Sequence, residues 1–436
     1  MRDQVKRRNE MSNLTFNECL QHTGITLDAE FEQFYLEFCA NPNEEPILDR
    51  AYLDEQAHRF ELSENHLKRM HEALDEIEAD PVLHWFSRFL VHDMCAARHR
   101  CDIDDYRAMT PCCMRNSDLY SFLLMIACVP RSIRRLENLE VPAYFYRDIP
   151  YMPMKRQFAK LEKTGDGTVS DFPWDMNFYT CSIFFLDRFN FIPYRLDENI
   201  RAYRNKETRE VITFYAEEMR IRRDGQIDGV NDVFDAQAYD NVFEETAGVI
   251  RGIPVSPAGI MEKEVVELKA DEWELVLKRG DILLGTHIPG GPGYEPARLK
   301  SSIKWAGDFF EKYFPEIDIK GYGSESWLYD PHLRLLLDEK SNICQMQNQM
   351  YIYPIESGGG MMYRELFEGN DNPTRADCRT SLQHKAIDRV EGGGQFTASS
   401  MFILKEDVRN VGGVLYGTAE QRADAIARMR DYESNP

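Results

Sequence analysis

The sequence predicts an α+β fold in which a helical N-terminal domain is followed by a domain built on a mixed β-sheet. Apolar residues recur at helical spacing through the first third of the chain, whereas short runs of aromatic and β-branched residues follow Pro150. A glycine-rich turn then separates an apolar run from the start of a helix. We expect a disordered lead at residues 1–12, the helical domain at 13–150, the sheet domain at 151–404 and a C-terminal extension at 405–436.

Charge and composition exclude several classes of protein. The 436 residues carry a formal net charge of -22, which argues against nucleic acid and an anionic membrane surface as partners. The hydrophobic share of 43% is that of an ordinary globular protein, and the longest apolar run, Tyr120 to Pro130, is too short to span a bilayer. We expect a cytoplasmic protein with no membrane segment, whose scattered cysteines are reduced. Its oligomeric state cannot be inferred from these features.

The N-terminal domain is expected to consist of amphipathic and buried helices. Phe31, Phe34, Tyr35 and Phe38 mark one apolar face at helical spacing. A second helix should run from Pro81 to Met94, since proline is favoured in a first turn. The remaining predictions are a central buried helix at Leu119 to Val129 and another helix at Arg131 to Glu140.

The sheet domain is expected to alternate short strands with turns. Aromatic residues are concentrated between Phe178 and Leu196, and Arg279-Gly280-Asp281 predicts a hairpin between the strands on either side of it. The further predicted strands are Val211–Tyr215, Met219–Arg223, Glu264–Ala270, Trp273–Lys278 and Ile282–Ile288.

The last third of the chain contains the best-marked helix. Pro296 lies in its first turn, apolar residues recur every three or four positions, and Pro315 ends it. A short strand at Ile317–Gly321 should follow. Short helices are predicted at Trp327–Leu337 and Asn342–Met350, closing strands at Tyr351–Pro354 and Phe396–Leu404, a polar excursion at Ser357–Gly393 and a final helix at Thr418–Tyr432.

The glycine turn is a candidate anion site. It follows the strand that ends near His287 and precedes the helix at Pro296. Free backbone N–H groups and the dipole of a following helix both favour a bound phosphate at such a turn. A short glycine cluster can equally be an ordinary tight turn.

The order of strands, glycine turn and helices matches the core of a GNAT-type N-acetyltransferase. Three segments strengthen this similarity: His287 to Gly291, Ser326-Trp327-Leu328-Tyr329-Asp330-Pro331, and Ser341-Asn342-Ile343. Together they resemble the bacterial acyltransferase-domain proteins that have a helical N-acyltransferase N-terminal domain and a GNAT-like C-terminal domain. Fainter similarities occur around Trp174 and in an aromatic–arginine strand at residues 185–191, and the resemblance spans roughly residues 120–404.

The resemblance implies an acyl-CoA-dependent N-acyltransferase that acts on a small-molecule amine. In a GNAT fold, two central strands splay apart and the acyl-CoA threads between them. His287 and Glu325 would then be candidate bases and Tyr329 the acid that protonates the departing thiolate. The residues expected to bind the cofactor are Ile288, Gly290, Gly291, Gly293 and Asn342. The residues expected to bind the substrate are Trp174, Arg188, Ser326 and Trp327.

Each of these residues also has a purely structural interpretation. His287 can bond a backbone carbonyl, and Glu325 or Ser326 can cap the helix that begins near Trp327. The tryptophans can be core residues, and Tyr329 can simply pack. A buried Arg188 can pair with an internal carboxylate, whereas Asn342 and Gln347 can cap and pack their own helix.

A departure from the GNAT pattern leaves a second function open. The usual pyrophosphate signature is Gln or Arg, two residues, Gly, any residue, then Gly or Ala, and no such match follows the proposed strand. The domain can therefore be a catalytically degenerate ligand-binding or regulatory module. A hydrolase ranks last, because no nucleophile is evident.

No metal is expected. The possible ligands His92, Cys95, His99, Cys101, Cys112 and Cys113 are irregularly spaced, unlike the paired ligands of a structural zinc site.

Overall fold

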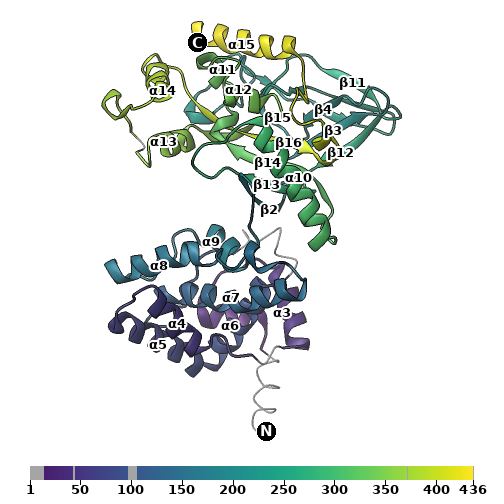
Figure 1. The fold of residues 1–436 in the computed structure, drawn as a ribbon. Helices are drawn as coiled ribbons and strands as arrows, with labels where there is room; N and C mark the ends of the chain where they lie inside the picture. Colours follow the sequence, from purple (N-terminus) through teal and green to yellow (C-terminus); the bar gives the residue numbers. More distant parts are fainter. Residues whose placement is uncertain (1–13, 43–44, 97–105, 371, 436) are drawn as a thin grey trace. The chain divides into compact units, whose positions relative to one another are not determined.

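The structure is a computed structural model that describes residues 14–42, 45–96, 106–370 and 372–435. The chain forms two compact units, residues 1–184 and 185–436, which are treated separately below (Figure 1). Residues 151–179, which the sequence assigned to the second domain, form helices of the first unit. The expected disordered lead, together with His99 and Cys101, lies outside the described residues.

The first unit is helical, as the sequence predicts. Its core is built from aromatic and aliphatic side chains, among them Phe31, Tyr35, Phe86 and Phe89, each at most 1% exposed. The helices are α2 (Phe16–Thr23), α3 (Phe31–Ala40), α4 (Arg50–Arg59), α5 (Glu64–Ala79), α6 (Pro81–Met94), α7 (Tyr120–Asn138), α8 (Tyr151–Thr164) and α9 (Phe172–Tyr179), with short 3-10 turns at Ser117–Leu119 and Ala143–Phe145.

Helix α7 is continuous, so the prediction of two helices separated at Pro130 was wrong. A proline inside a helix removes one hydrogen bond and costs about 3 kcal/mol. Every residue from Tyr120 to Val129 is buried, which offsets that cost.

The second unit is organised around a mixed six-stranded sheet, which confirms the predicted fold class. Its strand order is β1-β2-β13-β14-β16-β15. The central pair, β13 and β14, is parallel, whereas β13 pairs antiparallel with β2, and β16 pairs antiparallel with both β14 and β15. The strands are β1 (Phe184–Leu186), β2 (Phe189–Arg195), β13 (Ile282–His287), β14 (Ile319–Ser326), β15 (Tyr351–Gly358) and β16 (Thr397–Leu404).

Two details of this sheet differ from the predictions. The expected aromatic–arginine strand is divided between β1 and β2, with a turn at Asp187 and Arg188 in which Asp187 has a positive φ of 62°. Strand β14 is longer than predicted and continues to Ser326. It therefore carries Glu325 and Ser326 as strand residues.

A second sheet, of order β10-β9-β4-β3-β12, packs on one face of the first. The shared core contains Leu283, Tyr351 and Phe402 from the six-stranded sheet and Ile200, Val255 and Leu277 from the second sheet. The strands are β3 (Ile200–Asn205), β4 (Val211–Tyr215), β9 (Pro254–Ser256), β10 (Ile260–Met261) and β12 (Trp273–Lys278). Smaller sheets contain β5 (Arg220–Ile221) with β6 (Tyr239–Asp240), and β7 (Phe243–Glu245) with β8 (Val249–Gly252) and β11 (Val266–Lys269).

The hairpin predicted at Arg279-Gly280-Asp281 was wrong. Strand β12 pairs with β3 in the second sheet, whereas β13 pairs with β2 and β14 in the first. The turn therefore carries the chain from one sheet to the other. Leu196, where the chain crosses in the opposite direction, donates to the Asp281 carbonyl (2.9 Å) and accepts from the Gly280 N–H (2.8 Å).

Helix α10 (Pro296–Tyr313) packs on the other face of the six-stranded sheet, where the Tyr322 hydroxyl donates to the Ile303 carbonyl (2.7 Å). The predicted polar excursion contains helices α13 (Gly360–Leu366) and α14 (Ser381–Glu391). None of the helices in the described ranges has the length and apolar character needed to cross a bilayer. The remaining elements are 3-10 turns at Val230–Asp232, η6 (Trp327–Tyr329), Arg375–Asp377 and η8 (Lys405–Asn410), and helices α11 (Leu333–Leu336), α12 (Asn342–Gln347) and α15 (Ala419–Ser434).

Candidate functional site

The two parallel central strands separate at their C-terminal ends. Gly285 and Gly323 form the last residue pair that joins β13 to β14. Beyond this pair, β13 continues along β2 as far as His287, and β14 continues along β16 as far as Ser326. The result is the splay that the sequence predicted, with β13 and β14 each held by its outer neighbour.

The last pair consists of two glycines because the side chain of Tyr194 occupies the space that a Cβ atom would need at either position. A Cβ atom at Gly285 would lie 3.2 Å from the Tyr194 ring and 3.4 Å from His287 Nε2. A Cβ atom at Gly323 would collide with the Tyr194 hydroxyl. These contacts place Tyr194 and His287 on one face of the sheet. Side chains alternate along a strand, so Glu325 lies on this face as well.

His287 is a neutral imidazole at physiological pH. Burial lowers the pKa of His287 to about 4, because a charged ring loses its hydration in this position. A neutral ring can accept a proton without first losing one. The same burial makes His287 a weaker proton acceptor than an ordinary imidazole.

Glu325 is exposed at the end of β14, and a second carboxylate lies close to it. Glu325 pairs with Ser400 of β16. The Ser400 hydroxyl donates to Glu198 at 2.8 Å. Burial is the main cause that raises the pKa of Tyr194, and the negative charges of Glu198 and Glu325 raise it further. Tyr194, Glu198 and Glu325 therefore share one electrostatic environment.

The glycine turn leads from β13 into the first turn of α10. Gly290 and Gly291 are exposed, and no atom lies within 4 Å of a Cβ built on either residue. The N-cap residue of α10 makes no side-chain hydrogen bond to the helix. The first backbone N–H groups of α10 are therefore not capped by that side chain. Uncapped N–H groups and the helix dipole make this end of α10 suitable for an anion.

Arg188 supports this turn through hydrogen bonds to backbone carbonyls. The alternative of an ion pair with an internal carboxylate is not found among the described residues. Its guanidinium Nη2 donates to the carbonyls of Pro289 (2.7 Å) and Gly291 (3.0 Å). The side chain also packs against Gly293, whose φ is 95°. The positive charge of Arg188 therefore lies directly beside the turn.

Tyr329 lies on the α10 side of the splay. It is 1% exposed, and burial raises its pKa to about 12, while hydrogen bonding with Ser324 and Tyr294 has a smaller, lowering effect. The Tyr294 hydroxyl has no partner of good hydrogen-bond geometry among the described residues. Ser324 precedes Glu325, so Tyr329 and the two base candidates flank the splay from opposite faces.

Three other predicted residues have structural roles. The Ser326 hydroxyl accepts from the Leu328 N–H (3.2 Å) and so caps η6. Trp327 packs in a hydrophobic cluster with Leu333 and Phe396. Gln347 donates to the carbonyls of Leu328 (2.9 Å) and Asp330 (3.2 Å), which holds η6 in place.

The remaining predicted residues are less constrained. Asn342 is exposed at the start of α12, which Ser341 caps. Ile288 is half-buried where β13 meets the glycine turn. Trp174 belongs to α9 of the first unit, where its ring lies 5.7 Å from that of Phe178.

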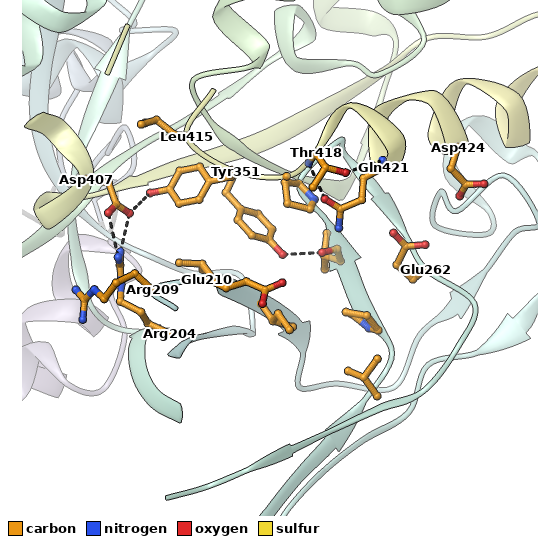
Figure 2. Close-up of a pocket in the computed structure, with 18 of the residues that line it drawn as sticks. Arg204, Arg209, Glu210, Glu262, Tyr351, Asp407, Leu415, Thr418, Gln421 and Asp424 are labelled. Atoms are coloured by element: carbon orange, nitrogen blue, oxygen red, sulfur yellow. Dashed lines mark hydrogen bonds and ion pairs between the residues drawn. The ribbon is translucent and has the colours of Figure 1, made fainter. Parts of the chain in front are cut away.

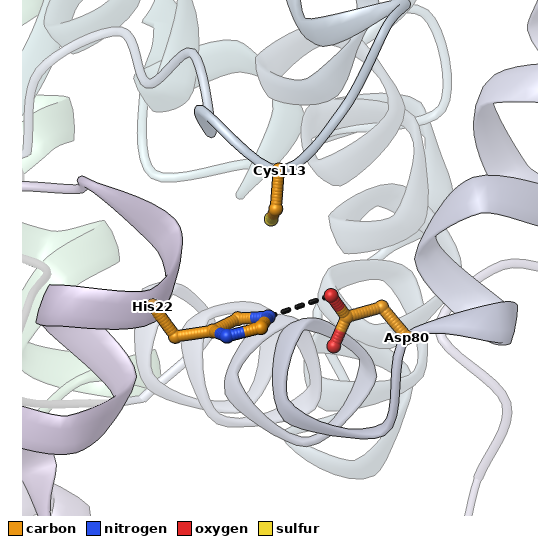
Figure 3. Close-up of side chains that lie close together, drawn as sticks. All are labelled: His22, Asp80 and Cys113. Carbon is orange, nitrogen blue, oxygen red and sulfur yellow. Dashed lines mark hydrogen bonds and ion pairs between the residues drawn. The ribbon is translucent and has the colours of Figure 1, made fainter.

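The possible metal ligands that the structure describes, a set without His99 and Cys101, do not form one cluster. Cys113 is the one described member of the predicted set that lies in a mixed cluster, with His22 and Asp80 (Figure 3). The two oxygens of Asp80 are already used: Oδ1 accepts from the N–H groups of Val82 and Leu83 at the start of α6, and Oδ2 lies 2.6 Å from His22 Nε2. Helix capping and an ion pair explain this arrangement without a metal.

A cavity of about 950 Å³ lies near β15, three strands away from β13 in the sheet (Figure 2). It lies beside the C-terminal extension. Arg204, 3% exposed, forms two hydrogen bonds to Asp407 (3.0 and 2.6 Å), and Tyr416 donates to the same carboxylate (2.6 Å). These contacts fasten the extension to β3.

Sequence reasoning missed Tyr194 and Glu198. Both belong to the segment where the chain leaves β2, and no motif marks them. The glycines at 285 and 323 were the available signal, because glycine inside a strand often marks a close approach.

Comparison with known proteins agrees with this geometry. The family described as GNAT-like C-terminal domain matches residues 183–402, just over half of the chain. No curated protein matches the chain.

Several solved structures match this chain at low sequence identity. An acyltransferase in complex with decanoyl-CoA is 16% identical, with a TM-score of 0.49, over 90% of this chain and 99% of that chain. An acyltransferase in complex with decanoyl-CoA and teicoplanin is 18% identical, with a TM-score of 0.46, over 90% of this chain and 99% of that chain.

Proposed function

Since the chain belongs to the family of proteins with a GNAT-like C-terminal domain, we propose that it is an acyl-CoA-dependent acyltransferase that acylates the amine of a small molecule. The observation that carries the proposal is the splay of β13 and β14 beyond Gly285 and Gly323, followed directly by an open glycine turn and an uncapped helix. This combination suits a long ligand with an anionic end.

The pyrophosphate of the acyl-CoA would bind at the glycine turn and the N-terminus of α10. Gly290 and Gly291 leave room for close approach, and Arg188 contributes positive charge beside the turn. In the usual GNAT signature, the arginine or glutamine that helps to bind the pyrophosphate belongs to the turn itself. Here Arg188, from outside the turn, would take that role. Ile288 and Asn342 are proposed to contact the rest of the cofactor.

The pantetheine arm would enter the splay. Backbone groups of Thr286 and His287 on one strand, and of Ser324 and Glu325 on the other, no longer pair with each other across β13 and β14. An amide-bearing chain can add to strand edges of this kind by forming backbone hydrogen bonds. Such bonds would place the thioester near the ends of the two strands.

The chemistry would then use residues on both faces of the splay. His287, neutral at physiological pH, accepts the proton that the attacking ammonium group loses, and Glu325 is the second candidate for this step. The amine nitrogen forms a bond to the thioester carbon, and the C–S bond breaks. Tyr329 donates its proton to the departing thiolate, and the tyrosinate that remains, which is the stronger base of the two, regains a proton from solvent.

Binding and turnover test the proposal separately. Isothermal titration with CoA, acetyl-CoA and decanoyl-CoA should show one saturable site, and failure of all three to bind would refute the function. Release of free thiol in the presence of a panel of small amines should then report turnover. We expect His287→Gln to retain CoA binding and to lose about 100-fold or more in kcat, whereas His384→Gln, a change at an exposed histidine, should leave both unchanged.

One observation favours a degenerate module as the second candidate. Tyr329 is 1% exposed, so an acid in this position has little access unless the ligand opens the splay. A protein that binds CoA tightly but releases no thiol with any amine would support the module over the enzyme.

A further inference from the structure

A second polar cavity lies away from the splay. It has a volume of about 580 Å³, and none of its lining residues belongs to β13, the glycine turn or α10. Its walls come from α11, the end of α14, the start of β16 and the end of α15. His332, Thr397, Arg389 and Arg430 are among the residues that line it.

His332 is held rigidly by the buried carboxylate of Asp330. Asp330 is fully buried and accepts from the His332 N–H (2.9 Å) and the Thr397 N–H (2.9 Å), and its Oδ1 lies 2.7 Å from His332 Nδ1. An ionised carboxylate can only accept, so the proton between them belongs to Nδ1. The orientation of the ring is therefore fixed.

The other ring nitrogen is left for the cavity. His332 is 4% exposed, and its Nε2 has no hydrogen-bond partner among the described residues. The hydroxyl of Thr397, which also lines the cavity, is buried and has no partner within the described part of the chain. Buried polar atoms without partners are uncommon in proteins, so the Thr397 hydroxyl offers a hydrogen-bonding position in the cavity wall to a water or a ligand.

The charges around the cavity favour an anion. Each lining carboxylate lies in an ion pair: Asp224 with Arg222, Glu433 with Arg389, and Asp388 with Arg375, which Glu391 shares. Arg430 lines the cavity and forms no ion pair with any described residue. Arg430 therefore has a positive charge that no carboxylate pairs within the described residues. Asp330, the buried carboxylate nearby, pairs with His332.

We propose that the cavity beside His332 binds a small oxyanion, a carboxylate or a phosphate, at a site separate from the splay of β13 and β14. The oxyanion accepts from Nε2–H of His332 when the ring carries both protons, and the charge on the ring is then balanced by Asp330. Arg430 attracts the anion at the rim. Binding here requires no acyl-CoA, so it can be tested independently of the proposed transferase activity.

The experiment follows the ring signals of the histidines by NMR in the full-length chain. Sodium phosphate and sodium succinate are titrated separately at constant ionic strength, with and without CoA, and the His332 signal is assigned by its loss in His332→Gln. We expect a saturable shift of the His332 signal with one of the two anions, whether or not CoA is present. The anion that causes the shift identifies the class of ligand.

Two matched arginine variants provide the decisive comparison. Arg430→Gln should weaken the binding about tenfold, which is the loss expected when one charged contact to an anion is removed. Arg409→Gln, at an exposed arginine outside the cavity, should not weaken it. The proposal is overturned if neither anion shifts the His332 signal at millimolar concentrations, or if the shift is the same in Arg430→Gln as in the unmodified protein.

Discussion

His287 and Glu325 each lie two residues beyond the last pair that joins β13 to β14, and both lie on the same face of the sheet. Had the ladder continued, they would have been neighbours in register. Because β13 and β14 no longer pair at this point, the two side chains are carried by separate strands.

Glu325 and His287 are expected to act on the same proton-transfer step. Glu325→Gln should lower kcat about tenfold, and the double variant with His287→Gln should be no slower than His287→Gln alone, because groups that act as a unit are not additive. Steady-state kinetics of the four proteins measure this coupling. Glu207→Gln, in the exposed turn after β3, is the control. Strictly additive losses would assign the two residues to different steps.

The low pKa of His287 should make the stability of the fold depend on pH. Its pKa is about 4 in the folded protein against 6.5 for an ordinary histidine. Between these values the unfolded chain binds the extra proton and the folded chain does not, so the free energy of unfolding falls as pH decreases from about 6.5 to about 4. The largest possible loss is about 3 kcal/mol. Urea unfolding at a series of pH values should show a shallower decline in His287→Gln, and identical slopes in both proteins would contradict the prediction.

Arg188→Gln should weaken the binding of the pyrophosphate part of the cofactor. The variant loses the donor that orients the Pro289 and Gly291 carbonyls, together with the charge beside the turn. We expect the Kd for CoA to rise about tenfold or more, whereas activity with an acyl-pantetheine, which has no pyrophosphate, should change much less. Arg279→Gln, at a surface pair with Asp197, is the matched control. Equal losses with both cofactors would show that Arg188 only stabilises the fold.

Gly323→Ala should destabilise the protein, because a methyl group there displaces the Tyr194 hydroxyl and lies 2.8 Å from a methyl of Leu283. Overpacking of this kind costs about 1–3 kcal/mol. Gly290→Ala places the same methyl group in open space and should change the free energy of unfolding by less than about 0.5 kcal/mol. Denaturant unfolding compares the two variants, and similar effects at both positions would disprove the packing of Tyr194 across the splay.

Asp407→Ala should loosen the C-terminal extension. It leaves the buried guanidinium of Arg204 without its carboxylate, which costs about 3–5 kcal/mol. The neighbouring carboxylate Glu406 forms an exposed pair with Arg209, so Glu406→Gln should cost less than about 1 kcal/mol. Limited proteolysis of the extension and thermal unfolding distinguish the two variants. If Asp407→Ala is as stable as Glu406→Gln, the buried pair does not hold the extension.

Periodicity predicted elements well where local preference and burial agree. Helix α6 begins at Pro81 and ends at Met94 as predicted, since Asp80 caps it and Pro81 suits its first turn. Local signals failed where tertiary contacts outweighed them. Burial of Tyr120–Val129 keeps α7 intact through Pro130, and the turn at Arg279–Asp281 joins two sheets because its flanking strands find better partners elsewhere.

The sequence by itself determined the order of elements, the glycine turn before α10 and the identity of the groups that end β13 and β14, because these depend on residues close together in the chain. The tertiary structure alone decided what those groups face. Register across β2, β13 and β14 places Tyr194 over Gly285 and Gly323. Arg188 reaches the glycine turn through hydrogen bonds to residues that are 101 or more positions away in the sequence. Such contacts have no local pattern, since they arise only when the sheet closes and each buried polar group must find a partner.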